Sequence, residues 1–360
     1  MLTVPKLTTS AAPAVELSQA AVSFGRKEQA VVALQETNLR IADGEFVALV
    51  GPSGCGKSTI MRLTAGLLQP TRGAVIVGGR EVGAKALRIG MAFQNPTMLP
   101  WLTIERNVML PLKIVKPFRA EYRAKKNGEF RDRVRALLAD VGLDKFASHY
   151  PWQLSGGMLQ RANLCRALVH EPSLLLLDEP FGALDAKVRK DLRRWLRELH
   201  DRLGLTSVFV THDQEEALEL ADRVVIMNRG VIEQIGTPRE VYDMPATPFV
   251  SEFVGETNRI PVTVADGRVL HHGQALDVSP KALANGPAEL HFRPHEARLG
   301  DDDPGALSIV VGAVHKRGGT WRVEARVDDI AVEIDTSGPL PERGARAGLR
   351  FDDVQIFPAS

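Results

Sequence analysis

The chain has 360 residues, and its 45 lysines and arginines against 44 aspartates and glutamates give a net charge of +1. This length predicts two or three domains, and a near-zero charge offers no overall field for binding nucleic acid, so no nucleic-acid partner is expected. The longest uncharged stretch, residues 89–104, contains two prolines, which excludes a membrane span. The N-terminus lacks an apolar signal-peptide core and the two cysteines fit a reducing compartment, so a cytoplasmic protein is expected.

Predicted elements begin after a flexible tail at residues 1–14. From residue 15 to about 245, short apolar runs alternate with amphipathic segments, which predicts an α/β domain with buried parallel strands. Helices are expected at residues 60–68 and 187–203, the second with an apolar stripe from Val188 to Leu203. The expected strands are residues 46–50, 89–93, 174–177, 208–210 and 224–227.

Two further segments differ from this α/β pattern in charge or in residue pattern. Residues 116–135 carry eight basic side chains against three acidic ones, which we interpret as a solvated helical face, with contact to a partner or to lipid headgroups as the alternative. Beyond about residue 258, alternating or β-branched segments are separated by Gly, Pro and Asp. This residue pattern predicts a separate all-β module, a small barrel.

The strongest motif is a glycine-rich loop between the expected strand at residues 46–50 and the expected helix at residues 60–68. Such a loop turns its backbone N–H groups toward phosphate oxygens at the positive end of the helix. Lys57 is expected to reach the β and γ phosphates and Ser58 to offer its hydroxyl to Mg²⁺. The helix terminus should also make Cys55 reactive toward thiol reagents. The loop consists of Gly51, Pro52, Ser53, Gly54, Cys55, Gly56, Lys57, Ser58 and Thr59.

Four polar side chains follow the ends of apolar strands, at the sheet edge where ligands bind in parallel sheets. Asp178 and Glu179 end a run of four leucines, and we expect Asp178 to hold Mg²⁺ and Glu179 to polarise the attacking water. Gln94 and His212 follow two further strands and are interpreted as γ-phosphate sensors. The alternatives are an acidic turn, a loop amide and a structural histidine.

A second segment suited to binding an anion, called the second cradle below, has a serine and two glycines before an expected helix. Its sequence is Leu154-Ser-Gly-Gly-Met-Leu-Gln-Arg161. With it, residues 15–245 resemble the ATPase subunits of ABC transporters, a fold class of α/β P-loop ATPase domain with a helical signature subdomain at about residues 95–165. The resemblance implies ATP and Mg²⁺ as cofactors and a head-to-tail dimer with a second copy of the chain. In that dimer the ATP of one copy meets Ser155, Gly156 and Gly157 of the other, and Asp185 bridges the two sites.

The resemblance assigns further roles. It implies that Phe24 stacks on adenine, a core phenylalanine being the alternative, and that Gln94 joins Ser58 and Asp178 around Mg²⁺. Catalysis is expected from Glu179, His212, Gln94 and Lys57. The implied partners are transmembrane permease subunits and, indirectly, an extracytoplasmic solute-binding protein, which would place the chain peripherally on the cytoplasmic face of the inner membrane.

The solute class is suggested by two subfamilies. Residues 91–103 and 150–155 resemble the nitrate, sulfonate and taurine import group, whereas residues 181–196 and 245–258 resemble the sulfate/thiosulfate importer. The expected function is therefore ATP-driven import of a small oxyanion or organosulfur solute. The alternative is a non-transport ABC ATPase acting on nucleic acid or ribosomes.

The sulfate/thiosulfate relatives carry a C-terminal β module, and residues 291–296 resemble a segment of it. We therefore expect residues 246–360 to form a regulatory-type, barrel-like β domain. Within it, Arg293 and His295 are interpreted as structural, with binding of a regulatory anion as the alternative.

Overall fold

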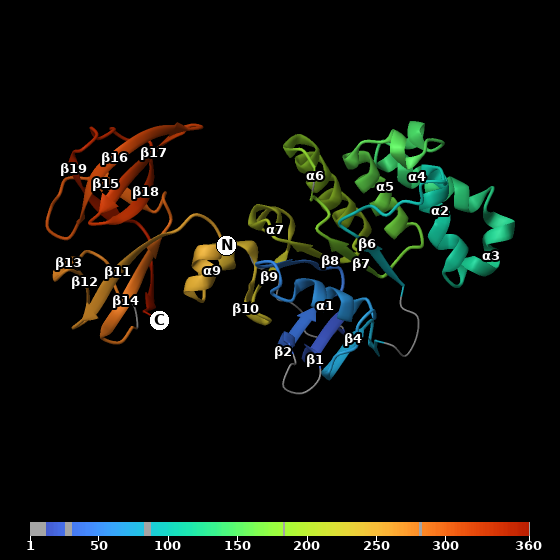
Figure 1. Cartoon of the computed structure of the whole chain (residues 1–360), viewed down its shortest axis with the longest axis horizontal. Coiled ribbons are helices and arrows are strands. Elements are labelled where there is room, and N and C mark those ends of the chain that lie inside the picture. The colour runs from blue at the N-terminus through green and yellow to red at the C-terminus, as the bar shows by residue number, and fades with distance from the viewer. Residues whose placement is uncertain (1–11, 26–30, 83–87, 183, 281–282, 360) are drawn as a thin grey trace, which may run out of the picture. The chain divides into compact units, whose positions relative to one another are not determined.

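The computed structural model describes residues 12–25, 31–82, 88–182, 184–280 and 283–359. The chain divides into two compact units, the first ending at Pro238 and the second running from Arg239 to Ser360. Most of the tail expected at residues 1–14 lies outside the described residues. Figure 1 shows the elements of both units.

A six-stranded sheet forms the centre of the first unit. Four neighbouring pairs in it are parallel, and only the edge pair of β9 and β10 is antiparallel. Every residue of β3 and β8 is buried, as the continuous apolar runs predicted. The strand order is β10 (Val231–Gly236), β9 (Arg223–Asn228), β3 (Phe46–Val50), β8 (Thr206–Thr211), β7 (Leu174–Asp178) and β6 (Ile89–Ala92).

A second, antiparallel sheet belongs to the same unit and was not predicted from the sequence. Its order is β2 (Val31–Ile41), β1 (Val15–Phe24), β4 (Arg72–Val77) and β5 (Arg80–Glu81). Helix α1 (Lys57–Thr64) joins the two sheets, because Ile60 and Leu63 share one apolar core with Leu17, Leu34 and Val208. The helix is therefore clamped by both sheets immediately after the glycine-rich loop.

Helices form a second core within the first unit. It is built from α2 (Ile104–Ile114), α3 (Phe118–Lys125), α4 (Glu129–Asp140) and α5 (Gly156–Leu168), which pack around buried residues such as Val108, Phe130 and Cys165. Helix α3 buries no residue, and Lys125 pairs with acidic residues one turn away on each side. These contacts favour the solvated-face interpretation of the basic stretch. No helix of the described residues is both long and apolar enough to span a membrane.

Helix α6 (Ala186–Leu203) confirms the helix expected at residues 187–203, but its apolar stripe is shorter than predicted. Leu192, Leu196 and Leu199 are buried, whereas Leu203 is 51% exposed. The reason is the left-handed Gly204, which ends the helix directly after Leu203. Helix α7 (Gln214–Leu220) follows β8 and begins at the capping side chain of Asp213.

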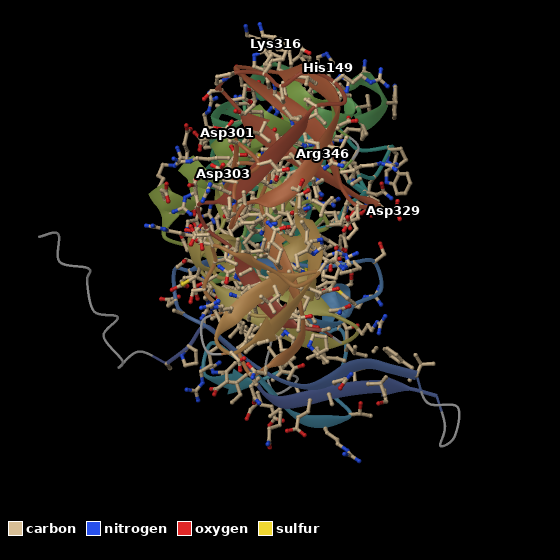
Figure 2. All side chains as sticks on the ribbon, turned by 90° about the vertical axis from the view of Figure 1, so that its left-hand side faces the viewer. His149, Asp301, Asp303, Lys316, Asp329 and Arg346 are labelled. Atoms are coloured by element: carbon tan, nitrogen blue, oxygen red, sulfur yellow. The ribbon has the colours of Figure 1, made fainter. Side chains whose placement is uncertain are left out.

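Helix α8 (Pro238–Asp243) begins at the last residue of the first unit, and the second unit continues with α9 (Pro248–Phe253) and is otherwise β structure. The expected all-β module is confirmed, but in the described residues it forms two five-stranded antiparallel sheets over one apolar core rather than one closed barrel. Charged side chains such as Lys316 and Asp329 project outward (Figure 2). The strand order of the first sheet is β13 (Gln274–Leu276), β12 (Arg268–His271), β11 (Asn258–Ala265), β14 (Gly286–Phe292) and β20 (Gln355–Pro358). The strand order of the second sheet is β15 (Ala297–Gly300), β19 (Arg346–Phe351), β16 (Leu307–Arg317), β17 (Thr320–Val327) and β18 (Ile330–Thr336).

Arg293 is a structural residue of this unit. Its side chain is 3% exposed, donates to the carbonyl oxygen of Ser251 at 2.7 Å and to the hydroxyl of Thr257, and stacks on the ring of Tyr242 at 4.7 Å. These contacts inside the unit support the structural interpretation of Arg293, and anion binding by this residue stays an untested alternative. His295 is exposed, and its ring stacks on the same Tyr242 ring, so its role stays a prediction.

An ionic cluster at the surface of the second unit depends on Glu256. Its carboxylate accepts two hydrogen bonds from Arg317, at 2.8 and 3.0 Å, and pairs with Arg322 at 2.6 Å. The hydrogen bonds from Arg317 and Arg322 lower the pKa of Glu256 to about 2.

Candidate nucleotide site

The glycine-rich loop between β3 and α1 is shaped by backbone conformations that only glycine adopts easily. Gly54 and Gly56 have φ angles of +79° and +109°. A Cβ atom on Gly51 would overlap the carbonyl oxygen of Met227 in the neighbouring strand β9. The loop therefore follows β3 tightly and brings its amides to the N-terminus of α1, where an anion is favoured.

Lys57 and Cys55 turn inward from this loop. The Nζ atom of Lys57, with the side chain 6% exposed, donates to the carbonyl oxygens of Gly51 and Pro52 at 2.7 and 2.9 Å. The Sγ atom of Cys55 lies 3.8 Å from the same Nζ atom, and Cys55 is only 2% exposed. Cys55 belongs to the apolar core that also contains Ile60 and Met227, so its thiol is not accessible in this conformation, and its reactivity toward thiol reagents stays a prediction.

The carboxylate of Glu179 is the meeting point of three strand ends. Gln94 Nε2, beyond β6, donates to Glu179 Oε2 at 2.7 Å, and His212 Nδ1, beyond β8, lies 3.2 Å from Glu179 Oε1. Glu179 follows β7 in a left-handed conformation, with φ +43°, and its N–H donates to Val210 at 3.0 Å. A non-glycine residue held in this region is strained, and such strain clusters at functional sites.

Asp178 lies at the same edge, as the last residue of β7. Burial and the neighbouring charge of Glu179 raise the pKa of Asp178, while Arg62 and Lys57 oppose the rise. Two adjacent carboxylates at one sheet edge favour a bound cation. Carboxylate, hydroxyl and amide oxygens are the ligands that Mg²⁺ takes, and Asp178, Ser58 and Gln94 supply one of each.

The second cradle begins helix α5 on the surface of the helical part. Ser155 caps this helix by accepting from the N–H of Met158 at 3.4 Å. A Cβ atom on Gly157 would lie 2.5 Å from Cγ1 of Val188, so packing against α6 explains this glycine. Gly156 has no atom within 4 Å of such a position, so no contact within the described residues explains its lack of a side chain.

Asp185 and Phe24 are also at the surface. Asp185 is exposed and caps α6 by accepting from the N–H of Val188 at 3.0 Å. In the described part of the chain, no hydrogen bond joins Ser155 or Asp185 to the glycine-rich loop. Phe24, the last residue of β1, is 48% exposed, so the core alternative for it is wrong.

Sequence comparison relates this chain to ATP-binding proteins of ABC transporters. The ABC transporter family model matches residues 34–182. The chain is 46% identical over 316 residues to the sulfate/thiosulfate import ATP-binding protein CysA 2 of Rhizobium meliloti, covering 87% of this chain and 85% of that protein. It is 44% identical to the corresponding protein of Xanthomonas campestris, covering 94% and 99%.

Two solved structures of ATP-binding proteins resemble the first part of this chain in fold. The dimeric post-hydrolysis structure of the ATP-binding cassette MJ0796, bound to ADP and phosphate, is 34% identical with a TM-score of 0.55, covering 62% of this chain and 99% of that one. CbiO1 of Clostridium perfringens is 25% identical with a TM-score of 0.56, covering 65% and 92%. The chain belongs to the ABC transporter ATP-binding family. It is an ATP-hydrolysing subunit with the cassette fold followed by antiparallel β sheets.

The cassette contains supporting residues that the sequence analysis missed. Asn163 on α5 donates to the carbonyl oxygen of Phe93 at 3.0 Å, and Arg166 donates to that of Thr97 at 2.7 Å. Arg166 also donates to Asn163 at 2.8 Å. These bonds hold the segment around Gln94, and the available signal was the presence of two polar residues, Asn163 and Arg166, three positions apart in the apolar second half of the helix.

Proposed function

We propose that this ABC transporter subunit hydrolyses ATP to drive import of sulfate or thiosulfate. The relatives that support this solute are named as sulfate/thiosulfate import ATP-binding proteins and match both units, over 86–96% of this chain in seven of them. The observation that carries the ATPase chemistry is the carboxylate of Glu179, bonded by Gln94 and His212 beside the glycine-rich loop.

In the proposed reaction Glu179 orients the attacking water and accepts its proton. Gln94 and His212 hold the carboxylate from both sides, which restricts it to one position. Lys57 exchanges its two carbonyl partners for phosphate oxygens when ATP enters the loop. Ser58, Gln94 and Asp178 would hold Mg²⁺, which supplies neutralisation of phosphate charge when bound.

The amides of residues 51–59 would bind the phosphates, through Gly51, Pro52, Ser53, Gly54, Cys55, Gly56, Lys57, Ser58 and Thr59. Phe24 offers an exposed ring for stacking on adenine. The ring needs no rearrangement of the core to do so, because it already lies at the surface at the end of β1.

A second copy of the chain would complete each site in a head-to-tail dimer. Ser155 and Gly156 are exposed at the start of α5, and no contact of the described residues accounts for the missing side chain at Gly156. Ser155, Gly156 and Gly157 would meet the ATP of the partner copy, with Asp185 between the two sites. The dimeric assembly of MJ0796 supports this arrangement.

Permease subunits are the proposed membrane partners, and a solute-binding protein acts through them. The exposed rings of Trp101 and Phe93, 68% and 41% accessible, lie close in sequence to Gln94 and offer an apolar contact for a helix of the permease. The subunit would then act peripherally on the cytoplasmic face of the inner membrane.

Uptake of labelled sulfate tests this function, in a bacterium whose own sulfate-import ATPase is deleted but whose permease and binding protein remain. The wild-type chain should restore sulfate and thiosulfate uptake, and Glu179→Gln should not. Restored uptake of nitrate or taurine instead would contradict the proposed solute. Association of the chain with nucleic acid or ribosomes alone would support the non-transport alternative.

A further inference from the structure

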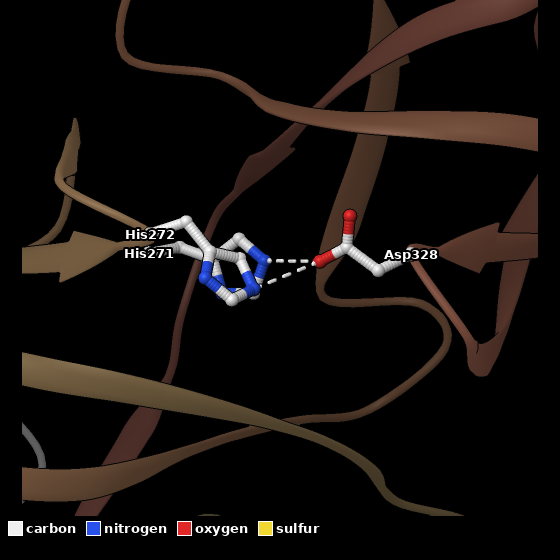
Figure 3. A group of neighbouring side chains, drawn as sticks. All are labelled: His271, His272 and Asp328. Carbon is white, nitrogen blue, oxygen red and sulfur yellow. Dashed lines mark hydrogen bonds and ion pairs between the residues drawn. The ribbon is translucent and has the colours of Figure 1, made fainter.

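Two histidines and an aspartate of the second unit meet at one point. His271 ends β12 and His272 follows it, while Asp328 lies in the turn between β17 and β18. Both Nε2 atoms lie 3.1 Å from the same oxygen, Oδ2 of Asp328. Figure 3 shows the two rings approaching that oxygen from one side, and one ligand atom from each residue lies within 4.8 Å of the others.

The His271 ring is held in one orientation by a second contact. Its Nδ1 atom lies 3.0 Å from the carbonyl oxygen of Pro261. A carbonyl oxygen only accepts, so Nδ1 donates its proton to Pro261, and Nε2 is the ring nitrogen that faces Asp328. Metal-binding histidines are oriented in this way by a carbonyl group behind the ring.

One ligand atom from each of the three side chains lies close enough to the others for a single cation to contact all of them. The spacing suits a metal ion, because two ligands 2.0–2.1 Å from a tetrahedral Zn²⁺ ion are roughly 3.3 Å apart. Two imidazoles and one carboxylate are a ligand set for zinc and its first-row neighbours rather than for Mg²⁺ or Ca²⁺.

We propose that His271, His272 and Asp328 bind a divalent transition-metal ion such as Zn²⁺. His271 is 8% exposed and forms the fixed side of the site, whereas the side chains of His272 and Asp328 are 77% and 59% exposed and leave a path for the ion. Three protein ligands leave the fourth position to water.

The ion would join the two sheets of the second unit. His271 and His272 belong to the hairpin of β12 and β13 in one sheet, and Asp328 to the hairpin of β17 and β18 in the other. These residues are 56 or 57 positions apart in the chain. Because the ion binds only when both hairpins are in place, it should raise the unfolding temperature of this unit.

The test uses the full chain without nucleotide or Mg²⁺ and measures Zn²⁺ binding by calorimetry, with Co²⁺ absorption as a spectroscopic readout. His272→Asn and Asp328→Asn each remove a ligand. Asparagine tolerates the left-handed backbone at both positions, where φ is +48° and +51°, so these variants should keep the fold. The matched control is His315→Asn, which removes an exposed histidine of the same unit that also faces a carboxylate, Glu324, at 3.3 Å.

One saturable Zn²⁺ site per chain is expected in the wild type and in the control, with affinity at least tenfold lower in the two ligand variants. Zn²⁺ should raise the melting temperature of the wild type and the control but not that of the ligand variants. Absence of saturable binding in the wild type would overturn the proposal. So would equal affinity in all four proteins, since the ion would then bind elsewhere.

Discussion

Replacement of Glu179 by glutamine is the sharpest test of the proposed catalytic centre. Glu179 Oε2 accepts from Gln94 at 2.7 Å, and Oε1 lies 3.2 Å from His212 Nδ1. A glutamine of the same shape keeps one oxygen to accept from Gln94 and presents an NH₂ group to His212 Nδ1, which can accept in the tautomer that carries its proton on Nε2. The substitution therefore removes the charge and the proton acceptor while the contacts remain.

The expected magnitudes follow from this geometry. The left-handed backbone at position 179, with φ +43°, carries the same strain with either side chain, so the free energy of unfolding should change by less than about 1 kcal/mol. Loss of a general base slows proton transfer by about 10²–10⁴-fold, an increase in the activation barrier of roughly 3–5 kcal/mol. ATP binding should remain, because the phosphate-binding loop is unchanged.

The assay compares the rate of phosphate release, the equilibrium binding of ATP and the elution volume with ATP present. Glu179→Gln should bind ATP, hydrolyse it slowly and accumulate as a dimer. Glu171→Gln is the matched control, because Glu171 also has a left-handed backbone, with φ +50°, and lies before β7 rather than after it. A Glu179→Gln variant that hydrolyses ATP within about threefold of the wild type would refute the role of Glu179 as the base.

Three further predictions test the second cradle, the proposed stacking of Phe24 on adenine and the stability of the second unit at acid pH. Gly157→Ala should lower stability by about 1–3 kcal/mol because its methyl group meets α6 at 2.5 Å, whereas Gly156→Ala, with nothing within 4 Å, should keep the melting temperature but lower ATPase activity in the proposed dimer. Phe24→Ala should weaken binding of a fluorescent ATP analogue by about 2–12-fold and Phe24→Tyr should not, an equal loss in both arguing against stacking. The lowered pKa of Glu256, about 2, means that its ion pairs stabilise the second unit above about pH 4.5 and stop doing so as the pH falls toward 2, so Glu256→Gln should flatten the loss of melting temperature between pH 5 and pH 3.

Local patterns predicted the parts of the site that lie within one segment of the chain. The glycine-rich loop, the carboxylates ending a run of leucines and the second cradle each combine a backbone requirement with a chemical group in a few consecutive residues. Strand and helix periodicity placed β3, β7 and α6 for the same reason, since burial of a run or a stripe is visible in sequence. The antiparallel sheet of β1, β2, β4 and β5 was missed because β-strand preference depends on packing context.

Contacts between distant segments were decided by the tertiary structure alone. The sequence placed Gln94 and His212 at strand ends, but only the parallel order β6-β7-β8 brings both onto the carboxylate of Glu179. Packing likewise placed Cys55 in the apolar core. It also brought Gly157, but not Gly156, against α6, where a side chain would collide. The chain by itself thus determined which groups are present and what chemistry they offer. The fold decided which of them share a site, because burial and spacing depend on segments far apart in sequence.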